Sequence, residues 1–233
     1  MLYKSAERGE KNIGWLHSRF TFSFSSYYQP TRNGFGLLKV VNDDTVQPGK
    51  GFGLHSHTNM EIISILLQGC MSHKDSMGYR EELEAGAVQI MSAGSGLRHE
   101  EYNIGSDEVR FLQIWIEPKL QNIAPRYQRR SFPQAQRHNR LLTVVSNEEG
   151  QQHCWINQNA RLSLGSFDAG SEQLYQLNPL NKGLFLYVIE GSVKAGSVAL
   201  EAGDGAGFWE TASLNICTAG TAQYLLIETP INH

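Results

Sequence analysis

The sequence predicts an all-β protein with two related antiparallel β-barrels in one chain. Short runs of apolar or alternating residues recur along it, and clusters of Gly, Asn, Asp and Ser separate them. The sequence Leu-Glu-Ala-Gly, each time placed after an apolar run that ends in Gly, occurs at 83–86 and again at 200–203. We therefore expect two domains, residues 1–125 and residues 126–233, with a polar connection between them.

The individual strands are marked by period-2 alternation or by apolar runs between turns. Three phenylalanines alternate with small hydroxyl residues and predict a half-buried strand at 19–28. The other predicted strands are 36–42, 61–68, 87–91, 111–116, 184–189, 205–208 and 224–227. A turn is predicted over the Asn-Asp-Asp sequence at 42–44. Helical periodicity is weak, and short helices are expected at most at 126–130 and 178–182.

Composition and charge indicate a globular protein without a general affinity for polyanions. Of the 233 residues, 40% are hydrophobic and 18% are charged, and the net charge is -3. The three cysteines, at 70, 154 and 217, lie far apart, and the N-terminus lacks the apolar core of a signal peptide. No apolar run approaches the roughly 20 residues of a membrane helix. We therefore expect a cytoplasmic protein with buried, inert thiols and no membrane partner.

Four side chains in two short segments predict a metal site. His55 and His57 are two residues apart, so an extended strand presents both imidazoles on one face. His99 and Glu101 have the same spacing in the second segment. If both strands line one interior, three imidazoles and a carboxylate converge on a nitrogen and oxygen site. Such a set suits one divalent Fe, Mn, Ni, Cu or Zn ion and leaves positions open for a substrate or O₂.

The two segments resemble the paired motifs of the cupin superfamily. The first motif corresponds to residues 49–69, with one extra residue before its final Gly. The second corresponds to residues 86–103, with Ser92 where the motif usually has Pro and two extra residues before His99. The resemblance implies that both barrels are of the jelly-roll type, so that the chain would be a bicupin.

A closer resemblance, over most of residues 10–130, is to the pirin family. It is carried in chain order by Gly14-Trp15, Phe22-Ser23-Phe24, Gly34-Phe35-Gly36, Gly51-Phe52-Gly53, Met60-Glu61-Ile62, His73-x-Asp75-Ser76-x-Gly78, His99-x-Glu101-x-Asn103 and Pro125-Arg126-Tyr127. The resemblance implies that His55, His57, His99 and Glu101 are the metal ligands. Glu61, a ligand in many other cupins, would then support a ligand without binding the metal.

The pirin resemblance also implies an activity. Bacterial pirin-like proteins are associated with quercetin 2,3-dioxygenase activity, so the expected substrates are a flavonol-like small molecule and O₂. Iron, as Fe(II), is the metal expected first. Glu101, or Glu61 in its place, would take a proton from the flavonol hydroxyl as general base. The alternative from a different class is a non-catalytic regulatory protein whose metal controls binding to a protein partner.

The second half lacks a matching set of ligands. Offsets of 122 and 117 residues between the repeated segments place Leu177 and Pro179 opposite the first histidine pair. They place Ile216 and Thr218 opposite the second pair of ligands. We therefore expect a structural role for the second barrel, as the pirin resemblance implies.

The remaining histidines and a group of arginines are expected to face solvent. Surface or turn positions are expected for His17, His73, His138, His153 and His233, which lack a partner at ligand spacing. Five arginines between residues 126 and 140 have no acidic residue among them. We expect this segment to be a solvated linker, with contact to nucleic acid as the less favoured alternative.

Overall fold

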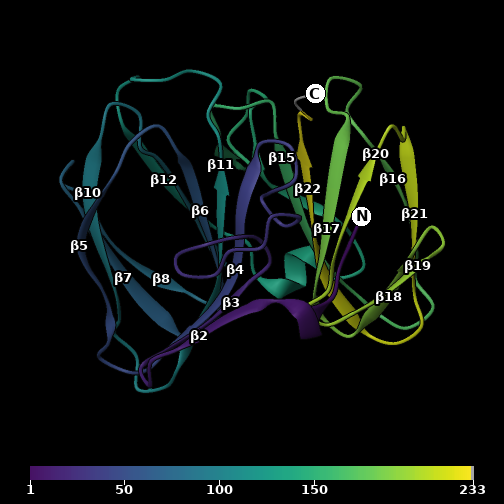
Figure 1. The fold of residues 1–233 in the computed structure, drawn as a ribbon, viewed down its shortest axis with the longest axis horizontal. Helices are drawn as coiled ribbons and strands as arrows, with labels where there is room; N and C mark the ends of the chain where they lie inside the picture. The colour runs from purple at the N-terminus through teal and green to yellow at the C-terminus, as the bar shows by residue number, and fades with distance from the viewer. Residues whose placement is uncertain (232–233) are drawn as a thin grey trace.

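Nearly all regular structure in the computed structural model, which describes residues 1–231, is β-structure (Figure 1). The strands of the first half are β1 (Leu2–Tyr3), β2 (Gly9–Asn12), β3 (Leu16–Phe20), β4 (Leu38–Val46), β5 (Gly51–His57), β6 (Glu61–Gln68), β7 (Cys70–Asp75), β8 (Arg80–Glu84), β9 (Ala87–Ser92), β10 (Leu97–Asn103), β11 (Val109–Ile116) and β12 (Arg126–Ser131). Those of the second half are β13 (Leu142–Ser146), β14 (Cys154–Trp155), β15 (Arg161–Phe167), β16 (Glu172–Gln176), β17 (Gly183–Glu190), β18 (Ser192–Ala195), β19 (Val198–Glu201), β20 (Gly205–Trp209), β21 (Ser213–Thr218) and β22 (Ala222–Thr229). Short 3₁₀ helices lie at η1 (Ser5–Glu7) and η2 (Gln134–Arg137). No helix within residues 1–231 has the length and apolar character needed to cross a membrane.

The strands form four sheets that lie side by side across the molecule (Figure 1). In the first half, a four-stranded sheet has the order β5-β10-β7-β8, and a seven-stranded sheet has the order β12-β9-β6-β11-β4-β3-β2. In the second half, the orders are β16-β21-β18-β19 and β1-β20-β17-β22-β15-β13-β14. Each half is therefore a sandwich of two mostly antiparallel sheets, and strand pairing within the described residues does not close it into a continuous barrel.

The strand orders confirm that the two halves are repeats of one unit. The order β9-β6-β11-β4 corresponds to β20-β17-β22-β15, and β5-β10-β7-β8 corresponds to β16-β21-β18-β19. Each Leu-Glu-Ala-Gly segment lies at the same point of its unit, where β8 leads into β9 and where β19 leads into β20. The predicted all-β chain with two related halves is therefore confirmed.

A continuous apolar core joins the two halves. Strand β6 contributes Ile63 and Ile65 from the first half, and β11 contributes Leu112. Phe185 of β17 and Leu225 of β22 pack into the same cluster from the second half. Because this core covers the inner faces of both seven-stranded sheets, their central strands are apolar on both faces, which explains their continuous apolar runs.

Most of the predicted strands are confirmed. Those at 61–68, 87–91, 111–116, 184–189, 205–208 and 224–227 are β6, β9, β11, β17, β20 and β22. The strand predicted at 36–42 is present as β4, but it begins at Leu38 and runs on to Val46. The turn predicted at 42–44 is therefore wrong, because these residues lie inside β4. The guanidinium of Arg110 donates hydrogen bonds of 2.9 and 2.8 Å to the two carboxylate oxygens of Asp43, so this acid is neutralised within the sheet.

The strand predicted at 19–28 is also largely wrong. Strand β3 ends at Phe20, and the two following phenylalanines lie in a loop. Phe22 is buried against the rings of Tyr3 and Phe185, at 5.2 and 5.5 Å between centroids. Phe24 packs instead on Trp115, at 5.4 Å. The alternation of aromatic residues thus reflects two separate packing sites and not one pleated face.

The segment expected to be a polar linker forms an edge strand. β12 pairs with β9 over its whole length, so the helix expected at 126–130 is wrong. The backbone N–H and C=O groups of this segment find their partners in β9, which makes the segment the edge strand of the first seven-stranded sheet. The helix expected at 178–182 is also wrong, because this segment contains only a turn. β12, which follows residue 125, thus belongs to a sheet of the first half. β1, which precedes residue 125, pairs with β20 in a sheet of the second half.

Candidate metal centre and adjoining pocket

Strands β5 and β10 bring the three predicted histidine ligands together. His55 and His99 are directly paired across the two strands, and His57 is paired with Leu97. The ring centroids lie 4.8 Å apart for His55 and His57, 4.3 Å for His55 and His99, and 5.1 Å for His57 and His99. Their ligand nitrogens all lie within 4.8 Å of one another. The two segments, separated by about 40 residues in sequence, therefore form one cluster.

Glu101 joins this cluster from β10. Leu97, His99, Glu101 and Asn103 alternate inward along this strand, and all four are buried. The pairing with β5 shifts register between His99 and Glu101, a bulge of the kind that re-aims side chains beside functional sites. The carboxylate lies within ligand distance of His99 and lines the same pocket as His55 and His57. The residues predicted from their spacing thus meet at one place.

The protonation and hydrogen bonding of the histidines fit a metal ion. Burial lowers the pKa of His57 and of His99 to about 4, and the nearby His55 ring adds to the lowering. Both rings are therefore neutral at pH 7, the form that binds a metal. Both nitrogens of the buried His99 ring lack a hydrogen-bond partner among residues 1–231. His55 Nδ1 donates to the Gly53 carbonyl at 2.8 Å, which leaves Nε2 as its ligand atom.

A polar network behind Glu101 holds its carboxylate in place. The Gln89 amide donates to Glu101 Oε1, and the Tyr127 hydroxyl donates to Gln89 Oε1 at 3.0 Å. Burial raises the pKa of Glu101, but His73, His99 and the Gln89 amide outweigh burial, so the pKa is lowered overall. Ser64 accepts a second hydrogen bond from the Gln89 amide at 3.1 Å. The carboxylate is thus oriented and ionised, as a metal ligand requires.

His73 belongs to this network, and its predicted surface position is wrong. Its side chain is fully buried, with Nε2 3.1 Å from Asp75 Oδ2 and Nδ1 3.9 Å from Glu101 Oε1. Its ring stacks on Tyr127 at 4.4 Å between centroids. Burial lowers the pKa of His73, but the two carboxylates outweigh burial and raise it overall. The two-residue spacing of His73 and Asp75 in the sequence is the spacing of two side chains on one face of a strand. The contact of His73 with Glu101, however, depends on the pairing of β7 with β10.

His73, His99 and Glu101 also lie close enough to form a second possible set of ligands. Two observations favour the set with His55 and His57. His73 Nε2 is already held by Asp75, and its Nδ1 lies 3.9 Å from Glu101 Oε1, so this buried ring is fixed behind the carboxylate. His55, His57 and Glu101 line the pocket, which His73 does not reach. His73 is therefore better described as the residue that orients Glu101.

The structure does not bring Glu61 to this cluster. Its carboxylate accepts hydrogen bonds from Ser92 Oγ at 2.7 Å and from the backbone N–H of Asn157 at 3.2 Å. Along β6, Glu61 shares a face with Ile63, which points into the core between the halves, whereas Ser64 points toward Gln89. β6 is buried on both faces, so its sequence has no alternation that shows which face Glu61 occupies. Ser92 belongs to the first half and Asn157 to the second, so Glu61 connects the two halves.

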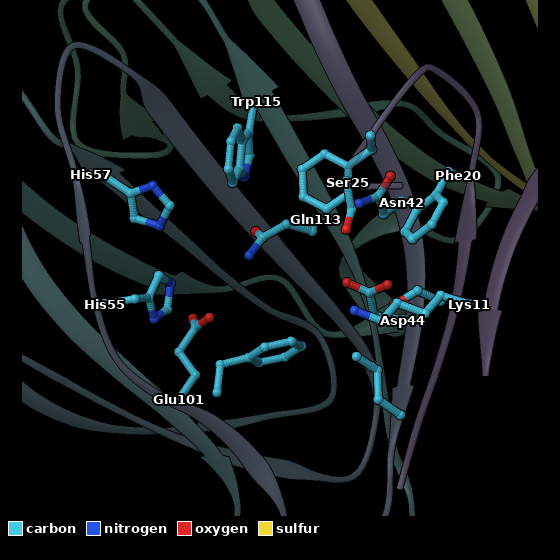
Figure 2. A pocket seen from close by; sticks show the side chains of 14 residues that line it. Lys11, Phe20, Ser25, Asn42, Asp44, His55, His57, Glu101, Gln113 and Trp115 are labelled. Atoms are coloured by element: carbon cyan, nitrogen blue, oxygen red, sulfur yellow. The ribbon is translucent and has the colours of Figure 1, made fainter. Parts of the chain in front are cut away.

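A pocket with a volume of about 240 Å³ opens directly beside the cluster (Figure 2). The aromatic residues that line it are Phe20, Phe24, Phe52 and Trp115. The polar residues that line it, besides those of the cluster, are Lys11, Ser18, Ser25, Asn42, Asp44 and Gln113. Apolar walls with a few polar groups and a candidate metal site at one side are typical of small-molecule sites.

The corresponding interior of the second half is filled by apolar side chains. Strand pairing places Gln173 opposite Ile216 and Tyr175 opposite Leu214, where the first half pairs His55 with His99 and His57 with Leu97. The offset of 122 residues, which selected Leu177 and Pro179, is therefore wrong for this strand, because the connection from β16 to β17 is longer than the connection from β5 to β6. Tyr175, Ile216 and Leu214 all belong to one buried apolar cluster.

Comparisons with known proteins agree with this architecture. Residues 3–116 match the Pirin family model, and residues 143–229 match the model described as the quercetinase C-terminal cupin domain. A quercetin 2,3-dioxygenase of Escherichia coli strain K12 is 36% identical over 230 residues, which cover 98% of each chain. A putative quercetin 2,3-dioxygenase of Pseudomonas aeruginosa is 37% identical over 221 residues, covering 94% of this chain and 95% of the relative.

Solved structures give the same relationship. The crystal structure of YhhW from Escherichia coli has a TM-score of 0.94 at 36% identity, covering 100% of this chain and 98% of that chain. The nickel(II) complex of the bacterial pirin YhhW has a TM-score of 0.93 at 35% identity, covering 100% and 99%. The predicted bicupin fold is therefore confirmed, with two sandwich-like cupin units in one chain, and the chain belongs to the pirin family.

Proposed function

We propose that the protein is a metal-dependent dioxygenase of flavonol-like aromatic compounds, with His55, His57, His99 and Glu101 as the ligands of one divalent metal ion. The observation that carries the proposal is the aromatic-walled pocket that opens onto His55, His57 and Glu101 (Figure 2). Relatives named quercetin 2,3-dioxygenase, which match nearly the whole chain, support the same reaction class. The substrates are then a planar phenolic compound and O₂.

The resident metal that we propose first is Fe(II). Three neutral imidazoles and one carboxylate suit several first-row divalent ions, so the ligand set alone does not select among them. The nickel(II) complex of the bacterial pirin YhhW makes nickel the first alternative. Reconstitution of the purified protein with each of Fe, Ni, Mn, Cu and Zn, followed by activity assay, tests the choice. We also propose a cytoplasmic setting, which suits the free cysteines at 70, 154 and 217.

The residues around the pocket have different chemical roles in this reaction. A bound divalent metal supplies Lewis-acid stabilisation of the oxyanion that forms when a flavonol hydroxyl loses its proton. Glu101 is placed to take that proton, because it is an ionised carboxylate that lines both the cluster and the pocket. His73 and Gln89 hold the Glu101 carboxylate from behind. Trp115, whose ring lies 5.1 Å from the His57 ring, forms an apolar wall that excludes water beside the cluster.

The structure favours this enzyme over the regulatory alternative. An arginine-rich surface near residues 126–140 would support binding of a nucleic acid or an acidic protein, but several of these arginines have partners within the chain. The guanidinium of Arg126 lies over the Trp155 ring at 4.6 Å. Arg129 donates to Glu81, and Arg130 donates to the carbonyl of His153. These contacts use the cationic groups to hold β12 in place.

Replacing Glu101 by Gln is expected to lower the turnover of quercetin by about 100- to 10,000-fold, the usual contribution of a positioned general base. The amide keeps the shape of the side chain and one coordinating oxygen, so part of the metal content should remain. Activity and metal content are measured on the same preparation. Glu100→Gln is the matched control, because that carboxylate faces outward and binds Lys74 at 3.0 Å. Turnover by Glu101→Gln equal to that of the control would contradict the assigned role.

A further inference from the structure

The pocket has a second polar end, away from the candidate metal centre. Asn42 and Asp44 are two residues apart on β4, so their side chains share the face that lines the pocket. Asp43, between them, points to the opposite face, where it binds Arg110 and accepts a hydrogen bond from Tyr187 at 3.2 Å. Figure 2 shows Asn42 and Asp44 on one side of the pocket and the cluster with His55 on the other.

Both side chains carry acceptor atoms that the protein does not satisfy. Asn42 is 2% exposed and Asp44 is 5% exposed. Asn42 Oδ1 and Asp44 Oδ1 have no hydrogen-bond partner among residues 1–231. Buried polar atoms in native proteins are nearly always paired, because an unpaired one loses its hydration without compensation. Two such atoms side by side, facing a cavity, indicate that a molecule in the cavity supplies the partner.

We propose that Asn42 and Asp44 form a subsite that binds a phenolic hydroxyl of an aromatic substrate whose other end lies at the candidate metal centre. The proposal rests on the proposed function, and it names the substrate class more narrowly: a polyphenol with a hydroxyl group remote from the one that faces the metal. Phe20 and Phe24, whose ring centroids lie 5.4 Å apart, form the aromatic wall next to this subsite. A phenol fits because its ring packs on such walls while its hydroxyl donates.

The charges around Asp44 favour a hydroxyl over an ammonium group or a carboxylate. Burial raises the pKa of Asp44 to about 7, with Asp43 and Glu101 adding to the rise and Ser18 and Arg8 opposing it. Near neutral pH this carboxyl is therefore partly protonated, and it can both donate to and accept from a hydroxyl. Lys11 lines the same pocket and disfavours a second cation there. A carboxylate group of a ligand is disfavoured, because it has no hydrogen to donate to the two unpaired acceptor oxygens.

The test compares quercetin with 3-hydroxyflavone, which keeps the hydroxyl that faces the metal and lacks the others. Dissociation constants are measured anaerobically on metal-loaded protein, and turnover is measured in air. The wild-type protein is expected to bind quercetin about 10- to 100-fold more tightly than 3-hydroxyflavone. Asp44→Leu, which keeps the approximate volume, should bring this ratio close to one, and Asn42→Leu should lower it independently. Glu100→Gln is the control, because this carboxylate faces outward and binds Lys74 away from the pocket, and it should leave the ratio unchanged.

The outcomes separate the subsite from the proposed activity. If the wild type prefers quercetin in binding, Asp44→Leu loses that preference, and neither compound is turned over, the subsite is supported and the dioxygenase is contradicted. Turnover with the same ratio in wild type and Asp44→Leu supports the dioxygenase and overturns the subsite. Absence of binding by either compound overturns the subsite as well. Thermal melting checks the fold: Asp44→Leu should melt near the wild-type midpoint, because the change removes a buried carboxyl oxygen that has no partner among residues 1–231.

Discussion

Alanine in place of His99 is expected to abolish both metal retention and turnover. The His99 ring lies at the centre of the cluster, 4.3 Å from the His55 ring and 5.1 Å from the His57 ring. Its loss leaves two imidazoles on β5 and a carboxylate that no longer has a neighbouring ligand on its own strand. Metal affinity should fall by more than the roughly 10- to 100-fold that changes outside a ligand set cost. Metal analysis after reconstitution and dialysis measures the retained ion.

The control for His99→Ala is His17→Ala. His17 is half-exposed on β3 and lies beside Glu10 on the surface, so its removal takes away an imidazole without touching the cluster. The thermal midpoint gives an independent readout, because an ion that binds only the folded state raises it. Metal should raise the midpoint of the wild type and of His17→Ala, and should leave that of His99→Ala unchanged. A full equivalent of metal retained by His99→Ala would show that the ion is held elsewhere.

Phe185→Ala is expected to destabilise the whole chain by about 3–5 kcal/mol, the usual cost of removing a fully buried aromatic side chain. Phe185 lies on β17 and is fully buried. Its ring contacts those of Phe22 and Phe35, at 5.5 and 5.8 Å between centroids, both from the first half. The substitution therefore opens a cavity between the two halves. Because one core serves both, unfolding should remain a single transition at a lower denaturant midpoint.

Tyr28→Ala provides the comparison for Phe185→Ala. Tyr28 is an aromatic residue of similar size that is 73% exposed, so its removal should change the unfolding free energy by less than about 0.5 kcal/mol. Chemical denaturation followed by tryptophan fluorescence and by circular dichroism measures both variants. Two separate transitions in Phe185→Ala, with the first half unaffected, would mean that the shared core does not couple the halves.

The four candidate ligands could be predicted from the sequence because their arrangement is local. A spacing of two residues on an extended strand puts both side chains on one face, and this holds for the pairs that begin at His55 and at His99. The residues that were missed depend on contacts distant in sequence. His73 reaches Glu101 only through the pairing of β7 with β10. Asp44 belongs to the pocket only because β4 continues through a segment with turn-forming residues.

The fold could be predicted in outline for a similar reason. The repeat and the central strands are visible because strands covered on both faces are apolar throughout, as in β6 and β17. The same property hides the direction in which a polar residue of such a strand points, as for Glu61, whose observed partners are Ser92 and Asn157. Edge strands such as β12 carry polar residues and lack this signal. Their position depends on the partner strand and not on their own sequence.

The most direct test of the proposed function is aerobic turnover of quercetin by protein reconstituted with Fe(II), and in parallel with Ni(II), beside a His55→Ala/His57→Ala double variant. The flavonol absorbance and the release of carbon monoxide are followed together. We expect loss of the absorbance with release of carbon monoxide in the metal-loaded wild type, and neither in the double variant. Bound iron and bound nickel without turnover by either form, or equal turnover by the double variant, would contradict a dioxygenase centred on this cluster.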